Sequence, residues 1–192
     1  AIHIVLATIP VVAVGFYLKV SGIEEQLRSV EIIAWTTLGF GILLWIADKV
    51  GMTINRLEHM RWGGALFIGL AQVLALIPGT SRSGSTIIGG MIFGLSRQVA
   101  TEFSFYLAIP TLLGASVYDT WKSRDLLSAG DIPLFAVGTI FAFFSALACV
   151  HWLIRFVASN SFRVFAWYRV IFGLLILAVT YTGLLHWGSA MD

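Results

Sequence analysis

Leu76-Ile77-Pro78-Gly79-Thr80-Ser81-Arg82-Ser83-Gly84-Ser85-Thr86 lies between two apolar stretches and decides how this chain must fold. These residues combine a helix-breaking Pro-Gly pair, a row of hydroxyl groups and one arginine in a strongly apolar sequence. An arginine at membrane depth is costly unless an anion or another partner compensates its charge. The stretch therefore predicts an anion site, and phosphate suits its donors best.

The composition is that of a polytopic, all-α membrane protein. Of 192 residues, 58% are hydrophobic and only 11% are charged, whereas soluble domains carry about 25% charged residues. The single Cys149 excludes a disulfide within the chain and a cysteine-rich metal site. A net charge of +2 is too small to indicate nucleic acid as a partner.

Five stretches have the length and apolarity of spanning helices, which need about 20 residues. They are residues 2–18, 30–47, 101–118, 132–155 and 165–187. The stretch 63–95 is too short for two crossings, and a single crossing would place Arg82 inside a helix broken by Pro-Gly. We therefore predict a re-entrant pair, with half-helices at about 65–77 and 86–95. Such backbone is tolerated at membrane depth only when protein or a wet cavity surrounds it.

The distribution of charge supports this arrangement. With a re-entrant pair, the loops at 48–63, around Arg97 and at 155–164 share one face. Seven basic residues then lie there: Lys49, Arg56, Arg61, Arg97, Arg155, Arg163 and Arg169. The opposite face receives only Lys19, Arg28, Lys122 and Arg124, together with most of the acidic residues. The basic excess predicts that the first face is cytoplasmic, with the N-terminus inside and the C-terminus outside.

A weak internal repeat suggests how the single membrane domain, residues 1–192, is organised. Leu6 to Pro10 followed by Gly15 is similar to Leu107 to Pro110 followed by Gly114. Two ordinary proline-kinked helices would explain the pattern equally well. If the repeat is real, residues 1–62 are the remainder of a first repeat and 63–192 form a second, as in inverted-repeat folds. A re-entrant segment should then precede residue 2, so we expect the chain to be truncated at its N-terminal side.

Several features of the motif suit it to bind phosphate. Pro78-Gly79 ends the first half-helix, and Ser83, Ser85 or Thr86 can cap the second, whose N-terminus favours anions. Arg82 adds a planar fork for phosphate oxygens, and the hydroxyls of Ser81, Ser83 and Thr86 add donors. We expect Thr80 and Ser85 to be turn residues. The alternative is that Arg82 pairs with a carboxylate such as Glu102. Neither a nucleotide P-loop nor a Gly-x-Ser-x-Gly elbow is present in the sequence.

The run Pro78-Gly79-x-Ser81-Arg82-Ser83-x-x-Thr86 resembles the second signature motif of the bacterial undecaprenyl-diphosphatase family, the bacitracin-resistance type. The flanks are similar as well: Gln72, Gly89-Gly90-Met91, Ser96-Arg97, Glu102-Phe103-Ser104-Phe105 and Gly130-Asp131-Ile132-Pro133. The lipid phosphatases related to acid phosphatases have a histidine where this chain has Ile88. The similarity covers nearly the whole chain.

The resemblance implies a hydrolase in the bacterial cytoplasmic membrane. It would cleave undecaprenyl diphosphate to the monophosphate and inorganic phosphate, which recycles the lipid carrier for peptidoglycan synthesis and gives bacitracin resistance. The family's site faces the outer side and uses a divalent cation, magnesium or calcium. By resemblance, the catalytic residues are Arg82, Ser81 and Thr86, and the residues that hold the substrate are Gly79, Ser81, Arg82, Ser83 and Thr86. A homodimer is left open.

One part of the family pattern is absent from this sequence. The family's first motif has two glutamates four residues apart and a Pro-x-Ser-Ser-x-Gly-His run, which supply the metal ligands and acid–base groups. No residue here takes those roles, so we expect this chain alone to bind diphosphate weakly and to hydrolyse it poorly or not at all. Two other functions compete: a transporter or channel for an anion or anionic lipid, which also uses broken half-helices, and a purely structural membrane subunit.

Overall fold

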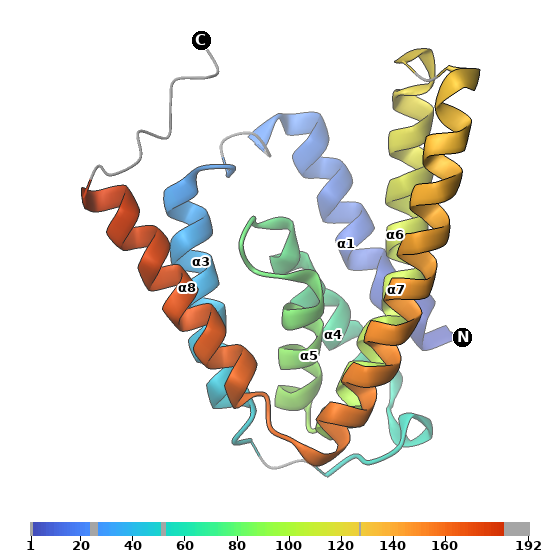
Figure 1. Ribbon diagram of the computed structural model, residues 1–192. Coiled ribbons are helices and arrows are strands. Elements are labelled where there is room, and N and C mark those ends of the chain that lie inside the picture. The colour runs from blue at the N-terminus through green and yellow to red at the C-terminus, as the bar shows by residue number, and fades with distance from the viewer. Residues whose placement is uncertain (1, 24–26, 51–52, 127, 183–192) are drawn as a thin grey trace.

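The computed structural model describes residues 2–23, 27–50, 53–126 and 128–182, and within them the regular structure is helical apart from one isolated β-bridge. Figure 1 shows the arrangement of the helices. In chain order they are α1 (Ile2–Ser21), α3 (Val30–Ala47), η1 (Leu57–His59), α4 (Trp62–Val73), η2 (Leu74–Leu76), α5 (Arg82–Phe93), α6 (Arg97–Lys122), η3 (Arg124–Leu126), η4 (Ala129–Asp131), α7 (Ile132–Ser159) and α8 (Arg163–Thr182).

The predicted spans are confirmed as helices. Among the described residues, α1, α3, α7 and α8 are long and apolar enough to cross a membrane. Helix α6 has 26 residues, which is also long enough, but charged residues near its two ends make it less apolar. The last predicted span extends past Thr182, and that part lies outside the described residues. The protein is therefore an all-α polytopic membrane protein.

The stretch 63–95 is a helical hairpin, as predicted, and not a single rod. Its two limbs, α4 with η2 and then α5, pack against each other. At its base the N–H groups of Thr53 and Ile54 both donate to Gly94 O at 2.9 Å, and Ser96 N–H donates to Ile54 O at 2.9 Å. The chain therefore enters and leaves the hairpin at the same end of the molecule.

The second limb begins earlier than predicted. Helix α5 starts at Arg82, not near Thr86, because Ser81 is the N-cap and accepts a hydrogen bond from Gly84 N–H at 3.3 Å. The expected capping by Ser83, Ser85 or Thr86 was wrong. As a result, Arg82 lies in the first turn of the helix, where the unsatisfied N–H groups are found.

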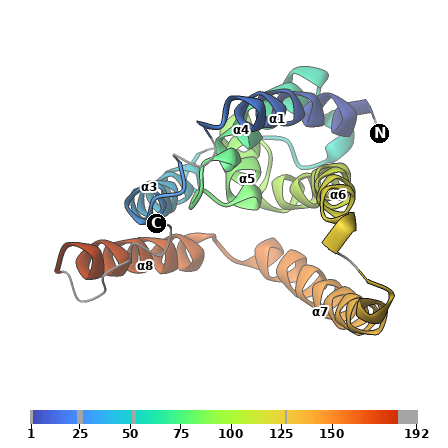
Figure 2. The same ribbon diagram turned by 90° about the horizontal axis from the view of Figure 1, so that it is seen from above.

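Helix α5 occupies the centre of the molecule. It packs against α3, α4 and α6, while α8 packs along α3 and α1 along α4. The view from above in Figure 2 shows α7 standing at the edge, next to α6. The turn between α4 and α5 is bonded to α3 and α8 through Thr36, Thr37 and Arg169, so protein supports its irregular backbone, as is required at membrane depth.

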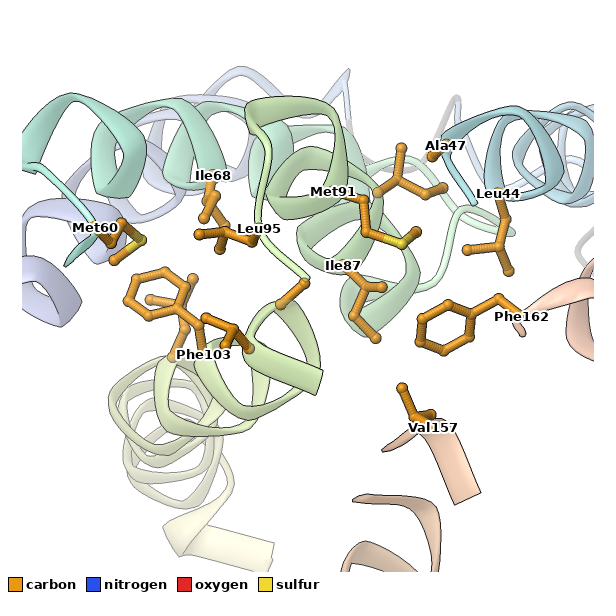
Figure 3. Close-up of a cluster of buried hydrophobic side chains, with 14 of the residues drawn as sticks. Leu44, Ala47, Met60, Ile68, Ile87, Met91, Leu95, Phe103, Val157 and Phe162 are labelled. Atoms are coloured by element: carbon orange, nitrogen blue, oxygen red, sulfur yellow. The ribbon is translucent and has the colours of Figure 1, made fainter. Parts of the chain in front are cut away.

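Three loops meet at the base of the hairpin, which we call the inner end. Arg97 pairs with the buried carboxylate of Asp48, and Phe162 N–H donates to Asp48 Oδ1 at 3.2 Å. These contacts join the ends of α3 and α8 to the start of α6, so the prediction that these loops share one face is confirmed. Figure 3 shows side chains of the buried apolar cluster, and many of them lie next to these loops: Leu44, Ala47, Met60, Met91, Leu95, Val157 and Phe162. The division of the chain into two repeats stays a prediction.

Candidate anion-binding site

The tip of the hairpin, residues 77–81, is shaped by Gly79. Its φ of +89° lies in a region that side chains rarely adopt. A Cβ on Gly79 would lie 2.2 Å from Thr36 Oγ1 and 2.6 Å from Ile33 O on α3. Both the backbone conformation and the close approach to α3 therefore require glycine.

Ser81 also has a positive φ, +66°, and it is the single non-glycine residue of this kind in the described chain. Such a conformation costs on the order of 1–3 kcal/mol and tends to be kept at functional sites. Ser81 is exposed, and its Oγ lies 3.4 Å from Ser83 Oγ at the mouth of the tip. Two hydroxyls thus stand side by side at the start of α5.

Thr80 is a residue of the turn, as the sequence predicted, whereas Ser85 lies inside α5, so the expectation was wrong for Ser85. Both are buried. The Thr80 hydroxyl lies within hydrogen-bonding distance of Leu74 O and Ile77 O, at 3.0 and 2.7 Å, where the first limb ends. The Ser85 hydroxyl donates to Ser81 O at 3.1 Å. The same carbonyl groups also accept backbone N–H groups, so the two hydroxyls add a second bond to each and brace the turn.

Arg82 is held by α6 rather than by a carboxylate. Its Nη1 donates to Ser104 O at 2.9 Å. Within the described residues it takes part in no ion pair, and Glu102 instead accepts a bond from Gln98 Nε2 at 2.9 Å. The alternative pairing of Arg82 with Glu102 is therefore wrong. A guanidinium has five N–H donors, and the bond to Ser104 leaves most of them for a ligand.

Thr86 lies one turn further along α5 and is buried. Its Oγ1 is 2.7 Å from Ser104 Oγ and 3.1 Å from the carbonyls of Arg82 and Ser83. The side chain and carbonyl of Ser104 thus contact two of the predicted site residues at once. A direct contact between Thr86 and a substrate stays a prediction.

Arg169 is the site residue that sequence reasoning missed. We counted it among the basic residues of the inner face, which was wrong. Its Nη2 donates to Gly79 O at 2.6 Å, with Thr80 O at 3.4 Å, so its guanidinium lies at the tip. The signal was present in the sequence, because Arg169 falls inside the predicted span 165–187. The cost argument that selected Arg82 applies equally to it.

The site offers donors for an anion but no ligand set for a metal ion. In the described parts of the chain, no three His, Cys, Asp or Glu side chains gather closely enough to hold one. Hydroxyl and guanidinium groups do not replace the carboxylates that magnesium and calcium prefer. These residues do not fit a divalent cation.

Fold and site together define a class of protein: a polytopic membrane protein with a re-entrant hairpin whose tip gathers arginines, hydroxyls and helix N–H groups. Such a gathering of donors is suited to an anion. The profile of the family described as "Bacitracin resistance protein BacA" matches residues 1–175. The chain belongs to this family.

Several curated relatives carry the name "Undecaprenyl-diphosphatase". The relative from Acidovorax ebreus (strain TPSY) is 48% identical over 192 residues, an alignment that spans 98% of this chain and 70% of the relative. The relative from Cupriavidus metallidurans is 57% identical over 148 residues, spanning 77% of this chain and 50% of the relative. The relative from Ralstonia pickettii (strain 12J) is 45% identical, spanning 97% of this chain and 71% of the relative.

Proposed function

We propose that this protein hydrolyses undecaprenyl diphosphate to undecaprenyl phosphate and inorganic phosphate, and that the hairpin tip holds the diphosphate. The observation that carries the proposal is Arg82: a guanidinium at the tip that no described carboxylate neutralises, fixed by Ser104 and adjacent to the N-terminus of α5. Membership of the family and the names of the relatives support the same reaction. The proposed role includes lipid-carrier recycling for cell-wall synthesis and resistance to bacitracin.

The tip supports this reaction by placing positive charge where negative charge develops. A water oxygen attacks one phosphorus, the phosphorus–oxygen bond of the anhydride breaks, and the charge spreads over the phosphoryl oxygens. Arg82 and the N–H groups at the start of α5 stabilise that charge without having to reorient. The exposed hydroxyls of Ser81 and Ser83 bind further oxygens. The described residues provide no general base at the tip.

The remaining parts of the proposal rest on the family resemblance. We place the protein in the bacterial cytoplasmic membrane with its site open to the outer side, so that the substrate approaches from the outer leaflet. Undecaprenyl diphosphate and the bilayer are its proposed partners. A magnesium or calcium ion is proposed as a cofactor, with ligands that we do not find among the described residues.

The test uses the protein expressed from its complete reading frame and purified in detergent. Phosphate release from undecaprenyl diphosphate is measured for the wild type and for Arg82→Ala. Loss of one preorganised donor costs roughly 100-fold to 1,000-fold in kcat, so Arg82→Ala should be nearly inactive. Arg155→Ala is the matched control, because Arg155 is an exposed arginine near the end of α7. It should keep wild-type activity, and EDTA should abolish hydrolysis until magnesium or calcium is restored.

Two results would overturn this proposal. Phosphate release that is equal in the wild type and in Arg82→Ala would show that the tip does not act on the diphosphate. An Arg82-dependent flux of anions across liposomes, with no hydrolysis of the lipid, would identify a transporter instead.

A further inference from the structure

The carbonyl groups of Pro78, Gly79 and Thr80 at the tip are held from one side. Thr36 Oγ1 lies 2.6 Å from Pro78 O, and Thr37 Oγ1 donates to Gly79 O at 3.3 Å. Arg169 Nη2 donates to Gly79 O at 2.6 Å and lies 3.4 Å from Thr80 O. All of these donors come from α3 and α8, which pack side by side (Figures 1 and 2).

This has a direct consequence for the N–H groups of the tip. A trans peptide is planar, and its N–H points opposite to its C=O. When the Pro78, Gly79 and Thr80 carbonyls point toward α3 and α8, the N–H groups that follow them point away. Thr80 N–H donates within the turn to Ile77 O at 3.3 Å. For the N–H groups of Gly79, Ser81, Arg82 and Ser83, the structure gives no acceptor among the described residues.

Successive free N–H groups of this kind form a concave anion-binding nest. In this protein the nest leads directly into the N-terminus of α5, which favours negative charge. Its shape depends on the carbonyls staying bound on the opposite side. The Gly79 carbonyl has two donors, Thr37 and Arg169, so these two side chains act on the same group.

The partial burial of Arg169 and its charge, unpaired within the described residues, indicate a role beyond packing. It is partly buried, and its Nε has no hydrogen-bond partner among the described residues. It belongs to none of the ion pairs found there. A neutral side chain could bond a carbonyl with a smaller desolvation cost, because a buried charge is expensive. A fixed positive charge behind the tip is useful when the opposite side binds a polyanion.

We propose that Arg169 is a positioning residue for the diphosphate: it fixes the Gly79 and Thr80 peptides so that the N–H nest of the tip faces the substrate. This inference rests on the proposed function, since it assumes that the nest binds the diphosphate. Arg169 acts through the turn and makes no contact with the substrate itself.

The test is a double-mutant cycle between Arg169→Gln and Thr37→Val. KM and kcat are measured for hydrolysis of undecaprenyl diphosphate, and binding of methylenediphosphonate is measured by calorimetry. Misplacing a site by about 1 Å can cost on the order of 100-fold, so Arg169→Gln should lower kcat/KM by about 10-fold to 100-fold with a higher KM. Because both side chains bond Gly79 O, the loss in the double mutant should be clearly smaller than the product of the two single losses.

Two further variants separate positioning from folding. Arg169→Lys keeps the charge but not the fork, so it should recover part of the lost methylenediphosphonate affinity. Thr111→Val is the control for loss of a half-buried threonine hydroxyl, because the bonds of Thr111 in the described structure are to carbonyls of its own helix. It should leave KM unchanged. Thermal unfolding midpoints identify variants that are merely destabilised.

The outcomes distinguish this inference from the proposed function. If the wild type neither binds methylenediphosphonate nor hydrolyses the lipid, the proposed function fails and the inference falls with it. If the wild type is active but folded Arg169→Gln keeps its KM and affinity, only the inference is wrong. Losses that multiply in the cycle would show that Arg169 and Thr37 act independently, which contradicts a shared role at the Gly79 carbonyl.

Discussion

Ser81 combines two opposing contributions to stability at one residue. Its positive φ is unfavourable, while its hydroxyl caps α5 by accepting the Gly84 N–H at 3.3 Å. A side chain kept in a strained conformation at the mouth of a candidate site is better explained by what it binds than by folding. Substitutions at Ser81 should therefore affect ligand binding and protein stability differently.

Substitutions at Ser81 should change stability in opposite directions. Ser81→Gly removes the conformational cost and loses little as a cap, so the free energy of unfolding should rise by about 1 kcal/mol. Ser81→Ala keeps the unfavourable φ and loses the cap, so the free energy of unfolding should fall by about 1 kcal/mol. Both should weaken methylenediphosphonate binding, because both remove the hydroxyl. Unfolding by SDS titration measures the difference, and a Gly variant less stable than the Ala variant would refute it.

Only some residues of the site could be predicted from the sequence. Arg82 and the hydroxyls stand out because they interrupt an apolar stretch over a few positions. Thr36 and Arg169 reach the tip from helices far away in the sequence, and no local pattern records such contacts. The spacing between motif and partner depends on how α3 and α8 pack, which only the folded structure shows.

At the level of elements, the hairpin depends on close approach of helix backbones. A Cβ at Gly69 would lie 2.5 Å from Ala7 O on α1, and one at Gly89 would lie 2.6 Å from Ala71 Cβ on α4. In membranes, where burial of apolar surface contributes little, small residues at helix contacts provide the packing. These contacts fix the depth and orientation of the limbs and therefore the position of the tip.

Two glycines of the same helix provide a matched comparison. Gly69→Ala would push α4 away from the α1 backbone, which cannot yield like a flexible side chain, and should cost about 1–3 kcal/mol of unfolding free energy. Gly63→Ala meets nothing within 4 Å and should be neutral or stabilising by up to about 1 kcal/mol. Thermal unfolding in detergent measures both. Equal midpoints for the two variants would contradict the role given to the α1–α4 contact.

The spans and the hairpin followed from length, apolarity and charge, because each of these constraints acts within one segment. Helix ends were less predictable. The start of α5 was placed four residues too late because several hydroxyl residues in a row are all competent caps, and the backbone conformation of Ser81 decides which one is used.

At the scale of the whole molecule, the inner end joins the separate helix pairs. The side chain of Asp48 is 1% exposed and receives Arg97 and Phe162 N–H, which links α3, α6 and the turn before α8. Pairs elsewhere are far more open: Arg124 and Asp125 are 55% and 83% exposed. Ion pairs in water contribute little, whereas loss of a buried partner is costly.

Asp48→Asn should therefore destabilise the assembly of the helices. The change removes a charged acceptor of two bonds, and the free energy of unfolding should fall by about 2 kcal/mol. Asp125→Asn is the control and should have almost no effect, because that pair is exposed. SDS titration followed by circular dichroism measures both variants. A similar stability for Asp48→Asn and the wild type would show that the inner end does not hold the helices together.

The contact between Gly79 and Thr36 means that the residues at these two distant positions constrain each other. The threonine oxygen occupies the space that any larger residue in the turn would need, and the same oxygen binds the preceding carbonyl. In a library randomised at both positions and selected for growth on bacitracin, glycine should survive at 79 almost without exception. The residues accepted at position 36 should then be serine and threonine. Each of the two positions therefore limits which substitutions the other can accept.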